Sequence, residues 1–485
     1  MGICYSARMM APSTTGRITT YFLGLFLGAA WFLGPGSTWA QQAATAPTPA
    51  VSDAVTNAEF SAAADEVLLR MSEITGLKLR SPVKKTLRSR EEIHAYVIKQ
   101  MNEEKNPAER YAGERSAEAF GLIPKGFDLD NFMVDLLTEQ IAGLYDPKAH
   151  EFYIADWIPL ADQRMVMAHE LTHALQDQYF EIQKWEKAAR PNDDAELARD
   201  ALLEGSAMAA MFDYILQGSG HSLRDLPEID PAMLTGDLGS SPTLQKAPPF
   251  LKDVLIFPYF AGLSFSVAIL KPAGWTSLPD VFAKPPASTQ QILHPEIYRE
   301  SRLPAAMTLP AIDKNLGADW TRLEENVMGE FGWKEILKQF LGEEKAKPLS
   351  VGWDGDRYSV YEQKQSKRLV LVARVRLASE EQAARFFDQY SEALVKKHDQ
   401  RSNSFKQPEF LSFDTSDGGV FLRCVANECL TVEGAGRAIF DVVNIGIGWP
   451  AAPQVHANPA QTPAKTSLRQ NYPTDRVPLK ASLVN

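Results

Sequence analysis

The sequence predicts an α+β protein in which a mainly helical region with a short antiparallel sheet precedes a small α+β module. Long segments between residues 58 and 345 place apolar residues at helical spacing. The run 150–155 is extended and directly precedes the most apolar of these helices. Residues 346–448 contain several strand-like runs around one amphipathic helix, a pattern typical of an antiparallel sheet with a helix packed on it.

Composition and charge favour an ordered globular protein that does not bind nucleic acid. The chain has 485 residues, of which 45% are hydrophobic, enough for two or three domains with sizeable cores. Its formal net charge is -11, and Lys and Arg do not dominate any segment. Because nucleic-acid sites need a basic surface, we exclude this class of partner.

Residues 1–40 have the parts of a secretory signal peptide. Arg8 and Arg17 precede an apolar run at 21–33, and the small residues that follow end at Ala40. Because the apolar run is short for a membrane span, we expect export to the periplasm or the medium, with cleavage near Ala40 and no other membrane contact. An uncleaved N-terminal membrane anchor is the alternative.

Three local signals divide the chain before the apolar helix. Residues 41–57, rich in Ala, Pro and Thr, are expected to form a flexible linker before a helix at 58–76. The run 89–92, Ser-Arg-Glu-Glu, predicts a capping box at the start of the next helix. Asp128 or Asp130 is expected to cap a third helix.

The most informative stretch is His169-Glu170-Leu-Thr-His173, in an apolar helix expected from about Asp156 to Gln178. Residues four apart lie above one another on a helix, so His169 and His173 can present two imidazole nitrogens to one ion, with Glu170 beside them. Metal coordination also satisfies imidazoles that a buried helix cannot leave unpaired. The spacing therefore predicts a zinc site. Chance occurrence is the alternative, but it leaves the apolar helix and a suitable downstream carboxylate unexplained.

The strand expected at 150–155 lies immediately before this helix in the chain. A strand with a free edge can take up an extended peptide as a further strand. We therefore expect it to hold substrate across the metal.

The helix expected from Asp194 to about Leu216 supplies the third ligand. Its carboxylates at Glu196, Asp200 and Glu204 are spaced by four and share one face. We choose Glu204, because it lies in the most apolar stretch and is followed by small residues that allow close helix approach. Asp200 is expected to accept a hydrogen bond from the non-ligating nitrogen of a metal-bound histidine. Glu196 is expected nearer the surface.

His169, Glu170, His173 and Glu204 resemble the site of the gluzincins, zinc metallopeptidases of the peptidase MA type. The wording HELTHALQDQ followed by ALLEGSA resembles bacterial exported members, over about residues 120–300. The spacing from His173 to Glu204 is longer than in the best-known members. The resemblance implies a zincin-like catalytic domain, one zinc ion per chain and a peptide or protein substrate.

The chemistry expected from the residues agrees with this resemblance. Two imidazoles and one carboxylate leave zinc a fourth position for water, whose pKa the ion lowers. Glu170 is then expected to act as general base towards that water and to pass the proton to the leaving amine.

Three later side chains are candidates for the same site. His294, held ahead of Pro295, is the first candidate for catalytic support of the oxyanion. Tyr259 and Tyr298 are candidates for contacts with the substrate. A role in packing or in a turn is the alternative for each of them.

Within the module at 346–448, strands are expected near 352–361, 368–375 and 410–413, with a helix at 379–397. The Pro, Ala, Gln and Asn content of residues 449–485 predicts a disordered tail.

Cys424 and Cys429 lie between two further strand-like runs of the module. In an exported protein they favour a disulfide that closes a hairpin. Free buried thiols are the alternative.

The sequence is thus interpreted as an exported zinc metallopeptidase with a C-terminal α+β module. One alternative is a non-catalytic zincin-like protein that binds a partner or holds an envelope assembly together. Another is a zinc amidase that hydrolyses a non-protein amide, such as a cell-wall crosslink, by the same water chemistry. Pocket shape decides between peptide and non-peptide amides, and sequence does not indicate that shape, nor the oligomeric state.

Overall fold

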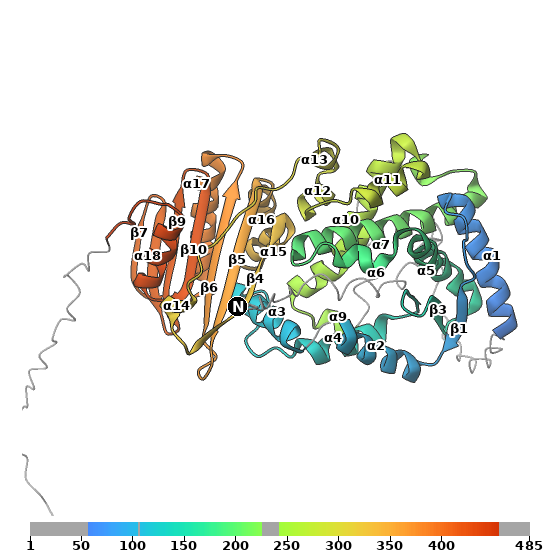
Figure 1. Cartoon of the computed structure of the whole chain (residues 1–485), viewed down its shortest axis with the longest axis horizontal. Helices are drawn as coiled ribbons and strands as arrows, with labels where there is room; N and C mark the ends of the chain where they lie inside the picture. Colours follow the sequence, from blue (N-terminus) through green and yellow to red (C-terminus); the bar gives the residue numbers. More distant parts are fainter. Residues whose placement is uncertain (1–56, 105–106, 226–241, 455–485) are drawn as a thin grey trace, which may run out of the picture. The chain divides into compact units, whose positions relative to one another are not determined.

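The computed structural model describes residues 57–104, 107–225 and 242–454, and it confirms the predicted α+β class. A helical region with a three-stranded sheet is followed by a seven-stranded antiparallel sheet with its own helices (Figure 1). The predicted signal peptide, the linker up to residue 56 and residues 455–485 of the predicted tail lie outside the described residues.

The helical region contains helices throughout its length, as the apolar spacing predicts. Its longer helices are α1 (Asn57–Thr75), α2 (Arg90–Glu104), α3 (Pro107–Phe120), α4 (Leu129–Gln140), α5 (Leu160–Phe180), α7 (Asp193–Leu216) and α10 (Pro249–Ala273). The shorter ones are α6 (Ile182–Lys187), α9 (Pro242–Gln245), α11 (Leu278–Ala283), α12 (Thr289–Leu293) and α13 (Pro295–Arg299), with 3-10 turns η1 (Gln217–Ser219), η2 (Leu223–Asp225) and η4 (Trp275–Ser277).

Two predicted helix caps are confirmed, and a third predicted helix start is wrong. The Ser89 N–H donates to the Glu92 carboxylate and Ser89 Oγ accepts from the Glu92 N–H, which is the predicted capping box. Asp128 caps α4. The start expected at Asp156 is wrong, because α5 begins at Leu160 and its N-cap residue is Pro159. Pro159 fixes φ but has no side chain that can accept a capping hydrogen bond.

The small sheet consists of β1 (Lys84–Arg88), β2 (Gly143–Asp146) and β3 (Glu151–Ala155), in the order β1-β3-β2. β3 is antiparallel to β2, as predicted, but parallel to β1, which the sequence did not reveal. The sheet is therefore mixed. Because both edges of β3 are paired, it cannot take up a substrate peptide as a further strand, and that prediction is wrong.

The seven-stranded sheet has the order β4-β5-β6-β10-β9-β8-β7 and is antiparallel throughout. Its strands are β4 (Trp320–Asn326), β5 (Trp353–Gln363), β6 (Leu369–Leu377), β7 (Ser402–Gln407), β8 (Phe410–Thr415), β9 (Gly418–Val425) and β10 (Glu428–Ala435). Its helices are α14 (Asp313–Leu316), α15 (Gly329–Leu341), α16 (Glu343–Ser350), α17 (Glu380–Lys397) and α18 (Arg437–Gly446).

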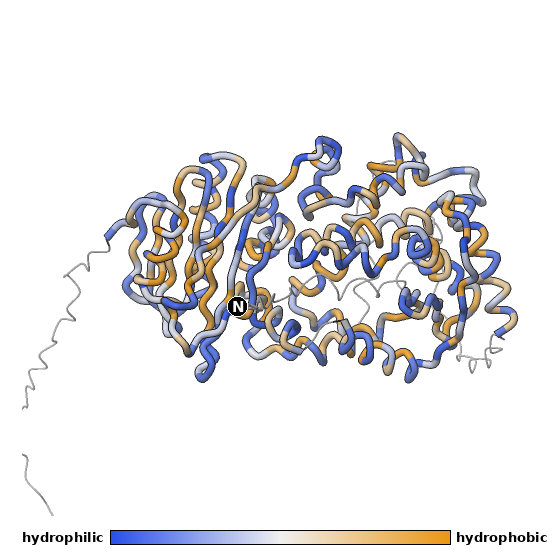
Figure 2. Tube along the Cα trace, in the orientation of Figure 1, coloured by the Kyte–Doolittle hydropathy of each residue, from blue (hydrophilic) through white to orange (hydrophobic). Residues whose placement is uncertain are grey.

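Alternating residues of these strands enter two different cores. On β9, Leu422 packs in a core shared with α15 and α17, whereas Phe421 packs with Phe440 of α18 on the opposite face. Figure 2 shows the apolar residues that run along these strands. The central strands of the sheet are thus buried on both faces.

The module begins earlier in the chain than predicted. β4, at 320–326, pairs with β5, so the sheet takes its first strand from before the boundary expected between residues 345 and 346. The core that contains the sheet also includes residues of α2, α3 and α4. The described residues up to Ala452 accordingly form one compact unit.

Two details at the end of the module test further predictions. Cys424 and Cys429 are directly paired across β9 and β10 and form the predicted disulfide. The tail predicted to be disordered from 449 is ordered at its start. The Pro450 carbonyl accepts from Arg423, and Ala452 is buried in the core around α18.

Helices α7 and α10 cross at unusually close range. A Cβ atom added to Gly205 of α7 would lie 1.9 Å from the carbonyl carbon of Gly262 on α10. Only residues without a side chain allow this approach. By length and composition α10 is apolar enough to cross a membrane, but 56% of its most apolar window is buried in this fold. In this fold α10 is therefore a helix of the core.

Candidate metal centre

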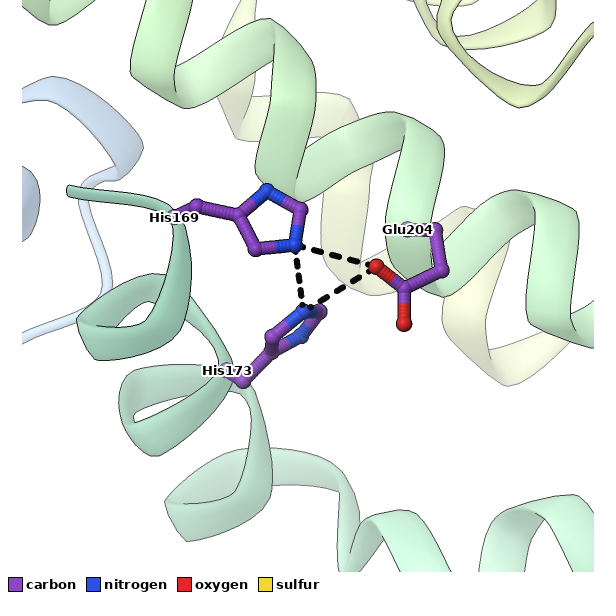
Figure 3. A group of neighbouring side chains, drawn as sticks. All are labelled: His169, His173 and Glu204. Carbon is purple, nitrogen blue, oxygen red and sulfur yellow. Dashed lines mark hydrogen bonds and ion pairs between the residues drawn. The ribbon is translucent and has the colours of Figure 1, made fainter. Parts of the chain in front are cut away.

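Helix α5 presents His169 and His173 towards helix α7 (Figure 3). One helical turn separates the two residues, so their rings lie one above the other, with centroids 4.7 Å apart. Apolar residues of α5, among them Met167, Ala168 and Leu171, pack with residues of α1 and α7 in one core, which fixes the direction of the histidine face. The pair predicted from the sequence is thus aimed at the helix predicted to hold the third ligand.

Glu204 of α7 completes a group of three ligand atoms. Its Oε2 lies 3.0 Å from His169 Nε2 and 3.4 Å from His173 Nε2, and the two nitrogens are 3.1 Å apart. The close crossing of Gly205 with α10 holds the following turn of α7 in place. The three predicted ligands therefore meet in the structure.

The three atoms fit a tetrahedral zinc ion. Bonds of about 2.0–2.1 Å at tetrahedral angles place neighbouring ligand atoms about 3.3 Å apart, close to the separations found here. Among the described residues, no fourth His, Cys, Asp or Glu belongs to the group. Two imidazole nitrogens that face each other in a buried place also need a shared partner, which a cation supplies. The donor set and its geometry both fit zinc with one open position.

Burial and the charges of the neighbouring ligands shift the pKa values of the three ligands, and the two effects act in opposite directions. Burial lowers the pKa of His169. Burial also acts to lower the pKa of His173, but the Glu204 carboxylate, together with Glu170 and Gln176, outweighs burial and raises this pKa to about 9. Burial acts to raise the pKa of Glu204, but the charge and hydrogen bonds of His173 and His169 together outweigh burial and lower this pKa. A cation that binds here needs both imidazoles in their neutral form, so metal binding favours loss of a proton from His173.

Glu170 lies beside the ligands on α5 and is 5% exposed. Its Oε2 accepts a hydrogen bond from the backbone N–H of Tyr145 on β2, at 2.9 Å. Burial raises the pKa of Glu170 to about 8. The carboxylate predicted as general base therefore has one oxygen held by the protein.

Gln176 is a residue of the site that the sequence analysis missed. Its Oε1 lies 2.9 Å from His173 Nδ1, and its Nε2 donates to Ser206 Oγ on α7. Ser206 donates its own proton to the Leu202 carbonyl, so its oxygen is the acceptor for the amide. These hydrogen bonds orient the Gln176 amide so that its oxygen accepts from His173 Nδ1. The Nε2 atom of His173 is then left as the metal-binding atom. The only signal in the sequence is its position one turn after His173.

Asp200 does not fill the role predicted for it. His173 Nδ1 pairs with Gln176, and His169 Nδ1 has no hydrogen-bond partner among the described residues. For His173 the reason is that Gln176, on the same helix, already takes the Nδ1 atom of that ring. Glu196 is likewise not near the surface as predicted: it is 2% exposed and pairs with Arg190 at 2.8 Å.

Of the three later candidates, only Tyr259 lies beside the ligands. Its ring centroid is 6.2 Å from that of His169, in the middle of α10. The Tyr298 OH donates to the Lys284 carbonyl at 2.8 Å. His294 Nε2 lies 2.8 Å from Glu330 Oε1, and its Nδ1 lies 3.7 Å from Glu296. The structure thus gives Tyr298 and His294 partners outside the metal group.

The comparisons with known proteins give a match that does not include the residues of the metal group. Residues 318–438 are similar to a family described as a domain of unknown function, DUF8575. The match begins just before β4 and ends just after β10, so it covers the large sheet and none of the metal group. No curated protein and no solved structure matches the chain. Inference about function therefore depends on the geometry of the site itself.

Proposed function

We propose that this protein is an exported zinc metallopeptidase, as the gluzincin resemblance implies. The observation that carries the proposal is the buried group of His169, His173 and Glu204, whose ligand atoms lie 3.0–3.4 Å apart. Glu170, the residue next to the first ligand, provides a buried carboxylate that interacts electrostatically with His173. A peptide substrate is part of the proposal because the gluzincin resemblance implies it and because water activated by zinc can attack a peptide carbonyl.

Each residue of the site has a distinct task. Zinc bound to the three ligands supplies a Lewis acid that polarises a carbonyl and lowers the pKa of water. Gln176 keeps the His173 imidazole in the tautomer that can bind metal. Glu170 takes a proton from the attacking water with one carboxylate oxygen and delivers it to the leaving amine.

The alternative of a purely structural metal is less well supported. Structural zinc sites are usually closed by four protein ligands, whereas the described residues supply three. A base adjacent to an open coordination position is also unnecessary in a structural site. Hydrolysis of a non-protein amide uses the same residues and is tested with the same variants.

The test measures zinc content and casein cleavage by the purified chain, beside Glu170→Gln. We expect the parent to bind about one zinc and to cleave casein, and Glu170→Gln to keep the zinc and lose cleavage. Glu196→Gln, a buried carboxylate of α7 outside the metal group, is the matched control and should retain both. Zinc bound by all three proteins without any hydrolysis contradicts the peptidase proposal, and cell-wall amides are then assayed. Absence of zinc from the parent contradicts the site.

Export is tested separately by the N-terminus of the protein. Expression of the full chain in a bacterium with a periplasm, followed by mass spectrometry, is expected to give a periplasmic form that begins near Gln41. An intact N-terminus in the membrane fraction supports an uncleaved anchor. An intact N-terminus in the cytoplasm contradicts export.

A further inference from the structure

Tyr145 of β2 makes two hydrogen bonds to helix α5, two turns apart. Its backbone N–H donates to Glu170 Oε2 at 2.9 Å, and its phenol OH donates to Asp177 Oδ2 at 2.9 Å. Glu170 and Asp177 are seven residues apart and share one face of α5. Tyr145 is 4% exposed, so both bonds are shielded from water. One residue thus connects the strand to the proposed base and to a second carboxylate.

Asp177 is fixed independently of Tyr145. Its Oδ1 accepts the backbone N–H of Ile182 at 3.1 Å, and its Oδ2 also lies 3.1 Å from His150 Nδ1. Burial, together with the Asp177 charge, raises the pKa of the Tyr145 phenol, which keeps the phenol protonated as a donor. The carboxylate is therefore a firm anchor for the tyrosine side chain.

The other end of β2 is also close to α5. A Cβ atom on Gly143 would lie 2.7 Å from a methyl carbon of Val166. The strand is thus held against the helix at both ends, by contact at Gly143 and by the OH–carboxylate bond at Asp177. The Tyr145 N–H between these points has little freedom to move away from Glu170.

We propose that Tyr145 is a positioning residue that holds the Glu170 carboxylate in the orientation required for proton transfer. The proposal rests on the proposed function, in which Glu170 is the base. A glutamate side chain otherwise has several torsional freedoms, and proton transfer needs its oxygen in hydrogen-bond reach of water. The N–H bond to Oε2 restrains the carboxylate and leaves Oε1 to take the proton.

The experiment compares Tyr145→Phe with Tyr153→Phe in the full chain. Tyr145→Phe keeps the backbone N–H and removes the anchor, whereas Tyr153, on the neighbouring β3, donates to Glu151 and not to α5. We expect Tyr145→Phe to lower kcat about tenfold, with KM and zinc content unchanged. The variant loses the hydrogen bond from the phenol OH to the buried Asp177 carboxylate, so the backbone N–H of residue 145 is held less firmly against Glu170. Tyr153→Phe should match the parent. Equal kcat in all three proteins overturns the proposal.

A second readout does not require catalysis. Hydrogen exchange followed by mass spectrometry measures protection of the backbone amide at residue 145, which should exchange faster in Tyr145→Phe than in the parent. Asp177→Ala should reproduce both effects, and Asp177→Asn, which keeps an acceptor oxygen, should largely restore kcat. Unchanged exchange at residue 145 in both Tyr145→Phe and Asp177→Ala overturns the proposal.

The two readouts separate this proposal from the proposed function. If the parent binds zinc but does not hydrolyse any substrate, the peptidase proposal fails. Even without activity, faster exchange at residue 145 in Tyr145→Phe than in the parent still supports restraint of Glu170 by Tyr145. If the parent is active and exchange is unchanged, the peptidase proposal stands and the positioning role fails.

Discussion

His173 Nδ1 lies 2.9 Å from Gln176 Oε1, so a glutamine one turn along α5 determines which nitrogen of this imidazole faces the other ligands. The glutamine is in turn held by Ser206 of α7, the helix that carries Glu204. The two helices of the site are therefore connected both by the three ligand atoms and by this hydrogen-bond chain.

Replacement of Gln176 by Leu is expected to weaken zinc binding by about 10–100-fold, because the orientation of His173 is no longer fixed. Competition with a chromophoric chelator measures the affinity. Gln176→Glu, which retains an acceptor oxygen, should bind zinc more tightly than Gln176→Leu. Gln178→Leu is the control, because its amide contacts Arg80 and Ser81 at the far side of α5. Equal affinity of Gln176→Leu and Gln178→Leu contradicts the role.

Replacement of Glu204 by Gln is expected to remove most of the bound zinc. The change keeps the size of the side chain but removes the charge that makes the oxygen a strong ligand and balances the cation. Metal analysis after dialysis should give about one zinc per parent chain and far less for the variant. Glu196→Gln, on the same helix and equally buried, should keep its zinc. Retention of zinc by Glu204→Gln contradicts the assignment of the third ligand.

A Cβ atom at Gly262 is expected to destabilise the fold where α7 and α10 cross. In Gly262→Ala this atom would lie 2.0 Å from the carbonyl oxygen of Ala201, so the two helices must separate. We expect the free energy of unfolding to fall by about 3 kcal/mol, the upper range for overpacking. Urea denaturation measures it. Gly218→Ala is the control, because a Cβ there meets no atom within 4 Å. Similar losses in both variants contradict this account of the crossing.

The stability of the large sheet is expected to depend on Glu433 in acid. Burial acts to raise the pKa of this carboxyl, but Lys397 at 2.8 Å and His398 at 2.9 Å outweigh it and lower the value from 4.5 to about 2. A depressed pKa gives stability that is present above pH 4.5 and is lost as the pH falls towards 2. By this shift the contribution is about 3 kcal/mol.

Denaturation of the parent and of Glu433→Gln between pH 2 and pH 7 tests this dependence. The difference in unfolding free energy should be largest at pH 7 and should shrink as the pH falls below 4.5. Glu381→Gln, an exposed residue paired with Arg385, is the control and should follow the parent. A difference that does not change with pH contradicts the role of the Glu433 charge.

The sequence predicted well those features that depend on nearby residues. The capping box at Ser89 and the strands on either side of Cys424 and Cys429 are formed by neighbours in the chain. The same holds for His169 and His173, which one helical turn brings together. Local backbone geometry fixes all of these, so residue spacing is sufficient to recognise them.

The sequence failed where partners come from distant segments. β3 was expected to have a free edge, but β1, more than sixty residues earlier, pairs with it. Asp200 was chosen as the partner of a histidine because it lies one turn before Glu204 on the same face of the helix, whereas Gln176 is the partner of His173 Nδ1. Sheet order and side-chain partners between elements are set by packing, for which a single chain carries no local pattern.

The sequence by itself determined the α+β class, the pair of histidines with Glu170 on one helix face, and Glu204 as the best third ligand. Each depends on residue type and spacing along one element. Only the tertiary structure decided that Glu204 Oε2 comes within 3.0 Å of His169, since this needs α7 to approach α5. It also decided that Tyr145 contacts Glu170, because the packing of β2 on α5 brings together groups that lie 25 residues apart in the chain.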